Sequence, residues 1–320
     1  MRRSIAFLCC VLFCMVSSAV MANNQNPNLN FGATDFSDPP RHVPGFVLIN
    51  PITFYSGNLK NGDGDSLPGT NKLSLIAYVP QLCWTANSKL PGDINWGLTV
   101  LMPLASLNAD SDLGLKAANN IMGDPIFGAF VGRAHQLTRD WTFHWMFEFD
   151  TYFPLGDYDK DAAFNTSANY WTFEPFLAMR LEMPYGFELS TRQHYTYNTK
   201  NHDYVNPAIT HDFNDHTLKA GDLWHFNFSA SKSLDFISPL LRFGAVGYYG
   251  QQLNNDEVDG NAVPNSKEKV FAIGPCLQYI HIHKGERKPS AIFSLKSYWE
   301  SNVQNRAEGN RTVFRMVIPF

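Results

Sequence analysis

Apolar and polar residues alternate along most of the chain after residue 45. Residues 141–153 show the pattern well: Trp141, Phe143, Trp145, Phe147, Phe149 and Phe153 share one side, and Thr142, His144, Glu148, Asp150 and Tyr152 share the other. Successive side chains of a β-strand point to opposite faces, so such a segment is a strand with one apolar and one polar face. Hydrocarbon outside and water inside a barrel produce this pattern, and so does a soluble sandwich.

Twelve segments are expected to be strands. They are residues 46–58, 71–84, 94–106, 124–136, 141–153, 170–182, 186–198, 222–232, 239–252, 268–282, 290–303 and 311–320. The connections alternate between short turns and long polar loops, except for the short connection 306–310. Outer-membrane barrels have short periplasmic turns and long outer loops. An open sheet edge is not tolerated in hydrocarbon. We therefore predict an all-β fold, a transmembrane antiparallel β-barrel of about 12 strands with both termini in the periplasm.

The N-terminal region has two parts that differ in composition. Residues 1–22 combine a basic start, a short apolar run and a small-residue end, which is typical of a cleaved signal peptide and too short for a membrane-spanning helix. Residues 23–45 are polar, rich in Asn and Pro, and do not alternate. They are expected to form a periplasmic leader or, alternatively, a plug folded back into the barrel and anchored by Phe31 and Phe36. Residues 46–320 would form the barrel.

Charge and cysteine content argue against nucleic-acid binding and against a zinc site. Cleavage removes two of the 25 bases and none of the 29 acids, so the mature chain would carry a net charge of −6, which argues against nucleic acid as a partner. Cys83 and Cys276 would remain. They could pair in an oxidising compartment, but they fall on distant strands, and two free thiols are favoured. No Cys/His cluster has zinc-ligand spacing, and His281 and His283 lack a third ligand, so no metal and no cofactor is expected.

Charged residues within the strands are expected to face the lumen. An Arg or Lys facing lipid at mid-depth would cost roughly 2–4 kcal/mol. The expected lumen-lining or substrate-path residues are Glu148, Asp150, Glu174, Arg180, Glu188, Arg192, His194, His225, Arg242, Lys296, Glu300 and Arg315. Both signs of charge are present, so a narrow, partly ion-paired passage is predicted rather than a wide pore.

Catalytic residues are not expected. A catalytic serine needs an adjacent histidine that a third group orients. Ser190 and His194 share a strand face but lie four residues apart, about 13 Å along an extended strand. The chain is therefore not expected to be an enzyme.

Several loop-adjacent motifs occur in a characteristic order over residues 115–320. They are Asn119-Asn120-Ile121-Met122-Gly123-Asp124-Pro125, Pro154-Leu155-Gly156-Asp157-Tyr158-Asp159, Ala220-Gly221-Asp222, Gly247-Tyr248-Tyr249-Gly250-Gln251-Gln252 with Asn255-Asp256, Ile273-Gly274-Pro275, Asn305-Arg306 and Gly309-Asn310-Arg311. This series resembles the outer-membrane transporter family associated with meta-cleavage phenol degradation pathways. The resemblance implies a barrel that admits aromatic or other hydrophobic small molecules. The motifs themselves are interpreted as turn and rim residues that maintain barrel shape.

The expected function is passive uptake of a small, aromatic or hydrophobic solute across the outer membrane of a Gram-negative cell. The alternatives are a structural or surface-interaction barrel without transport and a lipid-modifying outer-membrane enzyme. The expected partners are outer-membrane lipid and lipopolysaccharide, the solute, and the barrel-assembly machinery. That machinery would recognise the apolar side of the last strand, formed by Phe314, Met316, Ile318 and Phe320.

Overall fold

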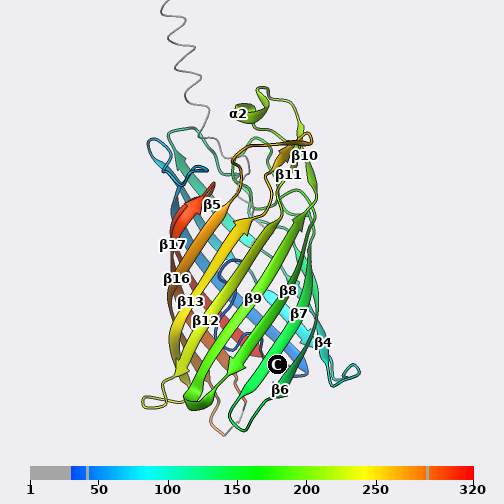
Figure 1. The fold of residues 1–320 in the computed structure, drawn as a ribbon, viewed down its shortest axis with the longest axis vertical. Coiled ribbons are helices and arrows are strands. Elements are labelled where there is room, and N and C mark those ends of the chain that lie inside the picture. Colours follow the sequence, from blue (N-terminus) through cyan, green and yellow to red (C-terminus); the bar gives the residue numbers. More distant parts are fainter. Residues whose placement is uncertain (1–29, 41–42, 286–287) are drawn as a thin grey trace, which may run out of the picture.

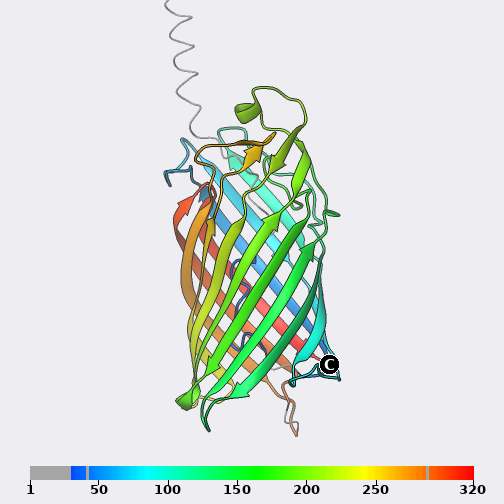
Figure 2. The same cartoon turned by 45° about the vertical axis from the view of Figure 1, so that its right-hand side comes forward.

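The protein forms a closed antiparallel β-barrel (Figures 1 and 2). The computed structural model describes residues 30–40, 43–285 and 288–320. The wall contains twelve strands, two of them each interrupted into two pieces. In chain order they are β1 (Gly45–Leu59), β2 (Asn71–Tyr78) with β3 (Gln81–Thr85), β4 (Asn95–Leu101) with β5 (Leu104–Ser111), β6 (Ile126–Gln136), β7 (Thr142–Tyr152), β8 (Thr172–Glu182), β9 (Phe187–Asn198), β12 (Leu223–Ser233), β13 (Leu241–Gln252), β16 (Lys269–His281), β17 (Ala291–Gln304) and β18 (Ala307–Pro319).

The last strand closes the barrel. β18 pairs with β17 on one side and with β1 on the other, in a register that runs from Val47↔Pro319 to Leu59↔Ala307. At the chain end, Phe46 and Phe320 exchange two backbone hydrogen bonds of 3.1 and 2.9 Å, and their rings stack 5.9 Å apart. Closure leaves no unpaired edge between the first and last strands. The predicted all-β fold, an antiparallel barrel of 12 strands, is confirmed.

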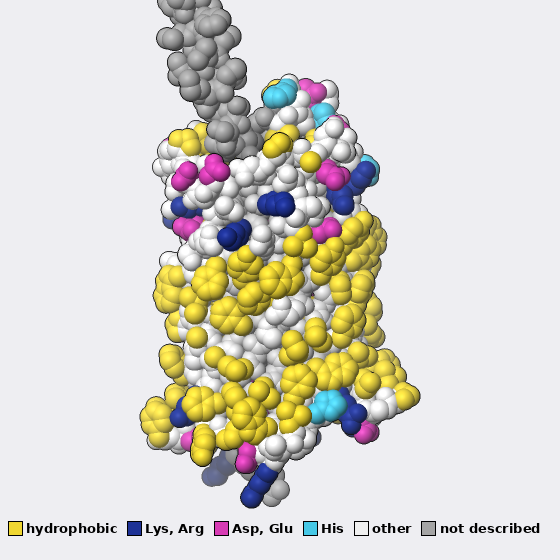
Figure 3. Space-filling view, viewed as in Figure 1, with side chains coloured by type: hydrophobic (Ala, Val, Ile, Leu, Met, Phe, Trp, Pro, Cys, Tyr) yellow, Lys and Arg dark blue, Asp and Glu magenta, His cyan; other side chains and the backbone are white. Residues whose placement is uncertain are grey.

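The alternation of side chains is the one expected for a membrane wall. In β7, His144, Met146 and Glu148 point inward and are buried, whereas Phe147 and Phe149 point outward and are each 43% exposed. On the face seen in Figure 3, apolar side chains cover the barrel wall, and most charged side chains lie above and below it. An outward apolar band of this kind matches a bilayer core. Among the described residues, no helix is long and apolar enough to cross a membrane.

Prolines interrupt two strands that were predicted to be continuous. Pro80 separates β2 from β3, and Pro103 separates β4 from β5, because proline has no N–H for the ladder. The two breaks are neighbours, since the Met102 N–H donates to the Pro80 carbonyl at 3.1 Å. Val79 in turn donates to the Pro51 carbonyl of β1 at 3.2 Å, so three prolines lie side by side across the wall. Beyond this line, β5 pairs with β2 and extends to Ser111, past the predicted strand end at residue 106.

Two predicted loops contain regular structure. β10 (Lys200–Tyr204), β11 (His216–Lys219), β14 (Glu257–Val258) and β15 (Asn261–Ala262) form a small second sheet, and α2 (Pro207–Thr210) lies beside it. Figure 1 places these elements at the end of the barrel opposite to the C-terminus, which we call the long-loop end. Tyr204, Leu218 and Val258 form their apolar core. These strands are too short for alternation to be recognised in the sequence. β18 also begins four residues earlier than predicted, so the last connection is a tight turn.

Candidate functional site

Residues 30–40 lie inside the barrel. The Phe31 ring stacks on Tyr248 with a centroid distance of 5.1 Å and meets His225 edge-on at 5.1 Å. The Arg306 guanidinium lies 4.7 Å from the centre of the Phe31 ring. Phe36 is also buried and belongs to the same apolar cluster on the inner wall. We call residues 30–40 the inner segment. It contacts the wall from β8 and β9 through β12, β13, β16 and β17 to β18, and it leaves the opposite side of the lumen less filled.

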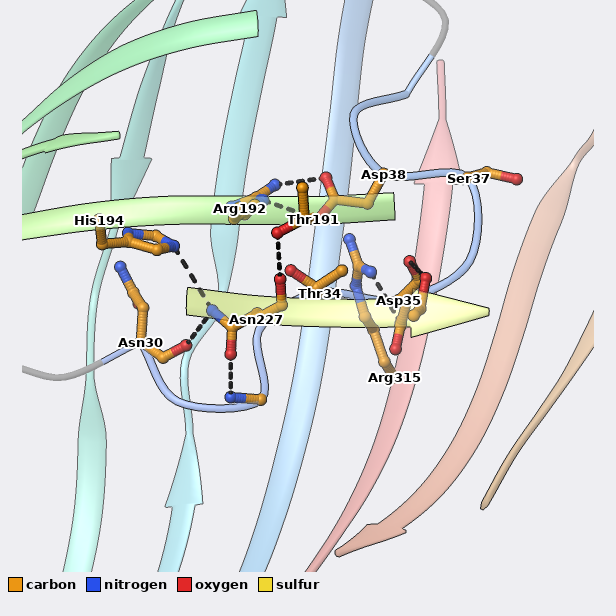
Figure 4. Close-up of polar contacts among 12 residues, drawn as sticks. Asn30, Thr34, Asp35, Ser37, Asp38, Thr191, Arg192, His194, Asn227 and Arg315 are labelled. Atoms are coloured by element: carbon orange, nitrogen blue, oxygen red, sulfur yellow. Dashed lines mark hydrogen bonds and ion pairs between the residues drawn. The ribbon is translucent and has the colours of Figure 1, made fainter. Parts of the chain in front are cut away.

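Asp35 forms the principal ionic contact of the inner segment (Figure 4). Its Oδ1 lies 2.5 Å from Lys296 Nζ, and its Oδ2 lies 2.7 Å from an Arg315 nitrogen. The Ser294 hydroxyl also donates to Oδ2 at 2.7 Å. Asp35 and Lys296 are each about 1% exposed. Their charges are therefore removed from water together, and loss of either partner would leave the other without compensation.

A second ionic contact holds the end of the inner segment. The two Asp38 oxygens lie 2.6 and 2.7 Å from Arg192 nitrogens of β9, as Figure 4 shows. Next to it, the Ser37 N–H donates to Glu188 at 2.5 Å. The second Glu188 oxygen faces two arginines of the wall, Arg180 at 3.9 Å and Arg242 at 3.8 Å. Acids of the inner segment therefore neutralise bases of the wall.

The backbone of the inner segment is recognised by wall side chains. Asn227 accepts from the Gly32 N–H at 2.7 Å and donates to the Asn30 carbonyl at 3.1 Å. Lys296 donates to the Gly32 carbonyl at 2.6 Å. Gly32 has a φ of 74°, and a Cβ there would lie only 3.0 Å from the Tyr298 ring. Glycine is therefore favoured by this backbone conformation, and any side chain would also press on the Tyr298 ring.

A cavity of about 290 Å³ remains between the inner segment and the wall formed by β1 to β5. Its wall side is apolar and includes Ile49, Leu73, Leu75, Ala77, Val79, Leu101, Leu104, Leu107 and Phe164. Its other side carries Arg192, Lys296, Arg306, Arg311 and Arg315 together with Glu148 and Asp150. Most of these cations have an acidic partner. Arg311 instead donates to the Phe31 carbonyl at 2.7 Å, and its guanidinium lies 5.5 Å from the Tyr55 ring.

All twelve residues expected in the lumen are located on the inner face. Nine are buried: Glu148, Asp150, Glu174, Arg180, Glu188, His194, His225, Lys296 and Glu300. Arg192, Arg242 and Arg315 are partly exposed. Glu300 accepts from the hydroxyls of Tyr55 at 2.7 Å and Tyr248 at 2.6 Å. The lumen is thus largely filled by paired side chains. The role of these residues in a solute path stays a prediction.

The sequence analysis missed four polar residues that shape the cavity region, namely Asp35, Asp38, Arg306 and Arg311. A signal existed for the two acids. The predicted lumen contained isolated bases on the last strands, and the preceding polar segment carried carboxylates that could pair with them. The apolar inner face of β2 was also missed, because Leu73, Leu75 and Ala77 alternate with side chains of mixed polarity, so the pattern does not show which face points inward. The alternating residues are Lys72, Ser74, Ile76 and Tyr78.

The outer face carries the remaining predicted residues. Phe314, Met316, Ile318 and Phe320 point outward from β18 and the residue after it, and Phe320 is 69% exposed. Their contact with assembly machinery stays a prediction. Cys83 and Cys276 are both free thiols, as favoured from the sequence.

The motifs that carry the family resemblance stabilise the loops at the long-loop end. Asp124 accepts from the Ser167 hydroxyl at 2.6 Å and from the Ala168 N–H at 2.9 Å. Asp256 accepts from the Gly221 N–H at 2.9 Å and from the Gln252 amide at 2.8 Å. Burial raises the pKa of Asp256 to about 7, despite these two hydrogen bonds. The motifs therefore fix loop conformation, as interpreted from the sequence, although Arg306 and Arg311 from the last two also reach the cavity.

Comparisons with known proteins agree with this architecture. The chain is similar to the COG4313 outer membrane channel from Pseudomonas putida F1, with a TM-score of 0.72 and 13% identity over 88% of this chain and 99% of that chain. It is more distantly similar to the translocator domain of the autotransporter NalP from Neisseria meningitidis, with a TM-score of 0.44 and 11% identity over 88% and 90% of the two chains. No curated protein matches the sequence significantly.

A family model provides the assignment that structural similarity at such low identity cannot. The model described as "Putative MetA-pathway of phenol degradation" matches residues 56–316, nearly the whole barrel. The chain therefore belongs to the family that this model describes.

Proposed function

We propose that the protein is a passive outer-membrane channel for small solutes that have an aromatic or other apolar body and one polar end. The cavity beside the inner segment is the observation that carries this proposal. One of its walls is apolar, through Leu75, Ala77 and Leu107, and the other presents guanidinium groups such as that of Arg311. Binding sites for small molecules commonly combine an apolar lining with a few polar groups that fix orientation.

The size of the cavity limits the solute. A volume of about 290 Å³ is sufficient for a single substituted ring but not for an oligosaccharide or a peptide. Family membership supports an aromatic compound, because the family model is described by phenol degradation. The inner segment would keep the passage narrow, so flux is expected to be slow and selective.

The proposed placement puts the barrel in the outer membrane, with both termini in the periplasm and the long-loop end outside. The supporting observations are the apolar outer wall and the short turns at the end where the chain finishes. Export by a cleaved signal peptide, residues 1–22, belongs to the same proposal, and that segment lies outside the described residues.

A size substitution in the cavity tests the proposal. Ala77→Trp would fill the cavity from the β2 side. Ile76→Trp is the matched control, because Ile76 is the next residue, points to lipid and is 56% exposed. The purified variants would be reconstituted into liposomes, and uptake of benzenesulfonate, an aromatic anion that stays ionised at any working pH, would be measured. Such an anion crosses lipid slowly, so the background is low.

The expected result is at least a tenfold loss of uptake in Ala77→Trp and normal uptake in Ile76→Trp. Equal uptake by both variants would show that the solute does not pass through this cavity. If the wild-type barrel, correctly folded, gave no uptake above empty liposomes, the proposal would be wrong and a non-transporting barrel would be favoured.

A further inference from the structure

Three side chains that commonly bind metals meet on the inner face of adjacent strands β8, β9 and β12. His194 and His225 are direct register partners, and Glu174 lies two residues before Phe176, which is the β8 partner of His194. One carboxylate oxygen and one nitrogen of each imidazole all lie within 4.8 Å of one another. We propose that Glu174, His194 and His225 bind a divalent transition-metal ion of the zinc type inside the barrel.

The burial of His225 is the strongest observation in favour of this site. Glu174, His194 and His225 are each 1% exposed or less. Neither ring nitrogen of His225 has a hydrogen-bond partner in the described part of the chain. A buried polar atom without a partner is costly and is rarely left so. A metal ion would satisfy one of these nitrogens through its lone pair.

The surrounding charge also favours a cation. Asp150 is the register partner of Glu174 on β7, and Glu148 points inward from the same strand, so three carboxylates gather on two strands. Arg192 lies nearby, with its guanidinium 4.9 Å from the Phe176 ring, but it is paired with Asp38. Arg306 lies over Phe31, which separates it from the site, and is paired with Glu268 at 3.4 Å. Local negative charge is therefore not fully compensated by the protein.

Neighbouring groups would orient the ligands. The Tyr152 hydroxyl donates to one oxygen of Glu174 at 2.8 Å, and the Asn30 amide donates to the other at 3.0 Å. The Asn227 amide lies 3.4 Å from His194 Nε2, so the Nδ1 atom, 2.5 Å from Glu174, is the one turned toward the site. Outer hydrogen bonds of this kind are a common feature of metal sites.

Ligation requires the loss of one proton and the movement of one ring. The ion would replace the proton between His194 Nδ1 and Glu174 Oε1, which are 2.5 Å apart, so these two atoms would separate and the proton would be released on binding. The two imidazole rings are stacked with a centroid distance of 4.2 Å and an interplanar angle of 8°, so an ion cannot lie in both ring planes as they stand. Rotation of His225 about its Cβ–Cγ bond would direct a nitrogen at the ion, and this rotation breaks no hydrogen bond to a described residue. Two histidines and one carboxylate form a zinc-type set with a fourth position for water.

The proposed ion would join three wall strands to the inner segment, because Glu174 also binds Asn30. The sequence analysis expected no metal, since the three ligands come from three separate strands. Only their register brings them together.

Metal titration of the folded, full-length protein tests the inference. Protein stripped with EDTA would be titrated with Zn²⁺, and bound metal would be counted by mass spectrometry. Co²⁺ would be titrated in parallel, because its visible absorption reports nitrogen and oxygen ligands in a four-coordinate site. His225→Ala and His225→Phe would be compared with the wild type. His225→Phe keeps the ring packing if the smaller residue fails to fold. The matched control is His135→Ala, a β6 histidine bonded to Trp145 at 3.1 Å.

The expected result is one Zn²⁺ equivalent and one Co²⁺ absorption band that are present in the wild type and in His135→Ala and absent from both His225 variants. Folding would be checked by the difference in gel mobility between heated and unheated samples. Equal metal content in wild-type and folded His225→Phe protein would overturn the inference. So would a folded wild type that binds no Zn²⁺ beyond the amount bound by His225→Phe.

Discussion

Removal of the Asp35 charge should release the inner segment. In wild-type protein this carboxylate compensates two cations, Lys296 at 2.5 Å and Arg315 at 2.7 Å. Asp35→Asn would leave Lys296 buried with only carbonyl partners. Breaking a buried ion pair by removal of one partner typically costs about 3–5 kcal/mol. Each 1.4 kcal/mol is about a factor of ten in an equilibrium constant. The equilibrium between docked and released inner segment should therefore shift by roughly two to nearly four orders of magnitude.

Single-channel recording in planar lipid bilayers measures this shift directly. The wild type should show a small conductance, because the inner segment narrows the lumen, and Asp35→Asn should show larger or more frequent open events. Asp63→Asn is the control, since Asp63 is exposed in a loop at the long-loop end and its side chain contacts, among the described residues, only Asn265 at 3.4 Å. In the double variant Asp35→Asn/Lys296→Met, the increase should be smaller than in Asp35→Asn, because no unpaired buried ammonium remains. If folded Asp35→Asn and Asp63→Asn conduct like the wild type, Asp35 does not anchor the segment.

Two further predictions concern the chain end and the loops. Deletion of Phe320 should lower the yield of folded barrel several-fold, because both backbone bonds to Phe46 are lost; unchanged yield on heated and unheated gels would exclude this role. The pKa of Asp256 is raised from 3.8 to about 7. The stability that Asp256 contributes to the loops at the long-loop end is therefore complete below about pH 4 and is lost as pH rises through 7. That loss is on the order of 4 kcal/mol. Amide exchange in residues 216–222 should therefore be faster at pH 8 than at pH 5 after correction for intrinsic rates, and Asp256→Asn should remove this difference. If Asp256→Asn kept the same pH dependence of exchange, Asp256 would not be the group responsible for it.

The wall of the barrel was predictable from the sequence because lipid imposes a strict constraint on every strand. In a membrane barrel, placing Glu148 or Asp150 outward toward lipid carries a free-energy cost, so alternation gives their facing once the chain is taken to be such a barrel. The positions of Pro80 and Pro103 were visible too, but their effect was not. Whether a proline bends or interrupts a strand depends on its register with the neighbouring strand, which the sequence does not specify.

The interior was less predictable because lipid imposes no constraint on the segment inside the barrel. Residues 30–40 have no period, and their partners lie far away in the chain, as in the contact between Asp35 and Lys296. The composition of residues 23–45 therefore allowed both a leader and a plug, and the leader was favoured. The residues of the proposed metal site were all recognised as lumen-facing, but their proximity follows from the pairing of β8, β9 and β12. Pairwise register across a barrel is the information that a single sequence lacks.

The central claim is that a small aromatic solute passes between the inner segment and the apolar wall of β1 to β5. Crystals of the protein soaked in a bromine-substituted benzoate would test it most directly, because anomalous scattering locates bromine independently of any assumption about the path. The account predicts a bromine peak in the cavity next to Leu75 and Ala77, with the carboxylate toward Arg311. Bromine bound only on the lipid-facing wall or among the outer loops, with the cavity free of it, would contradict the account.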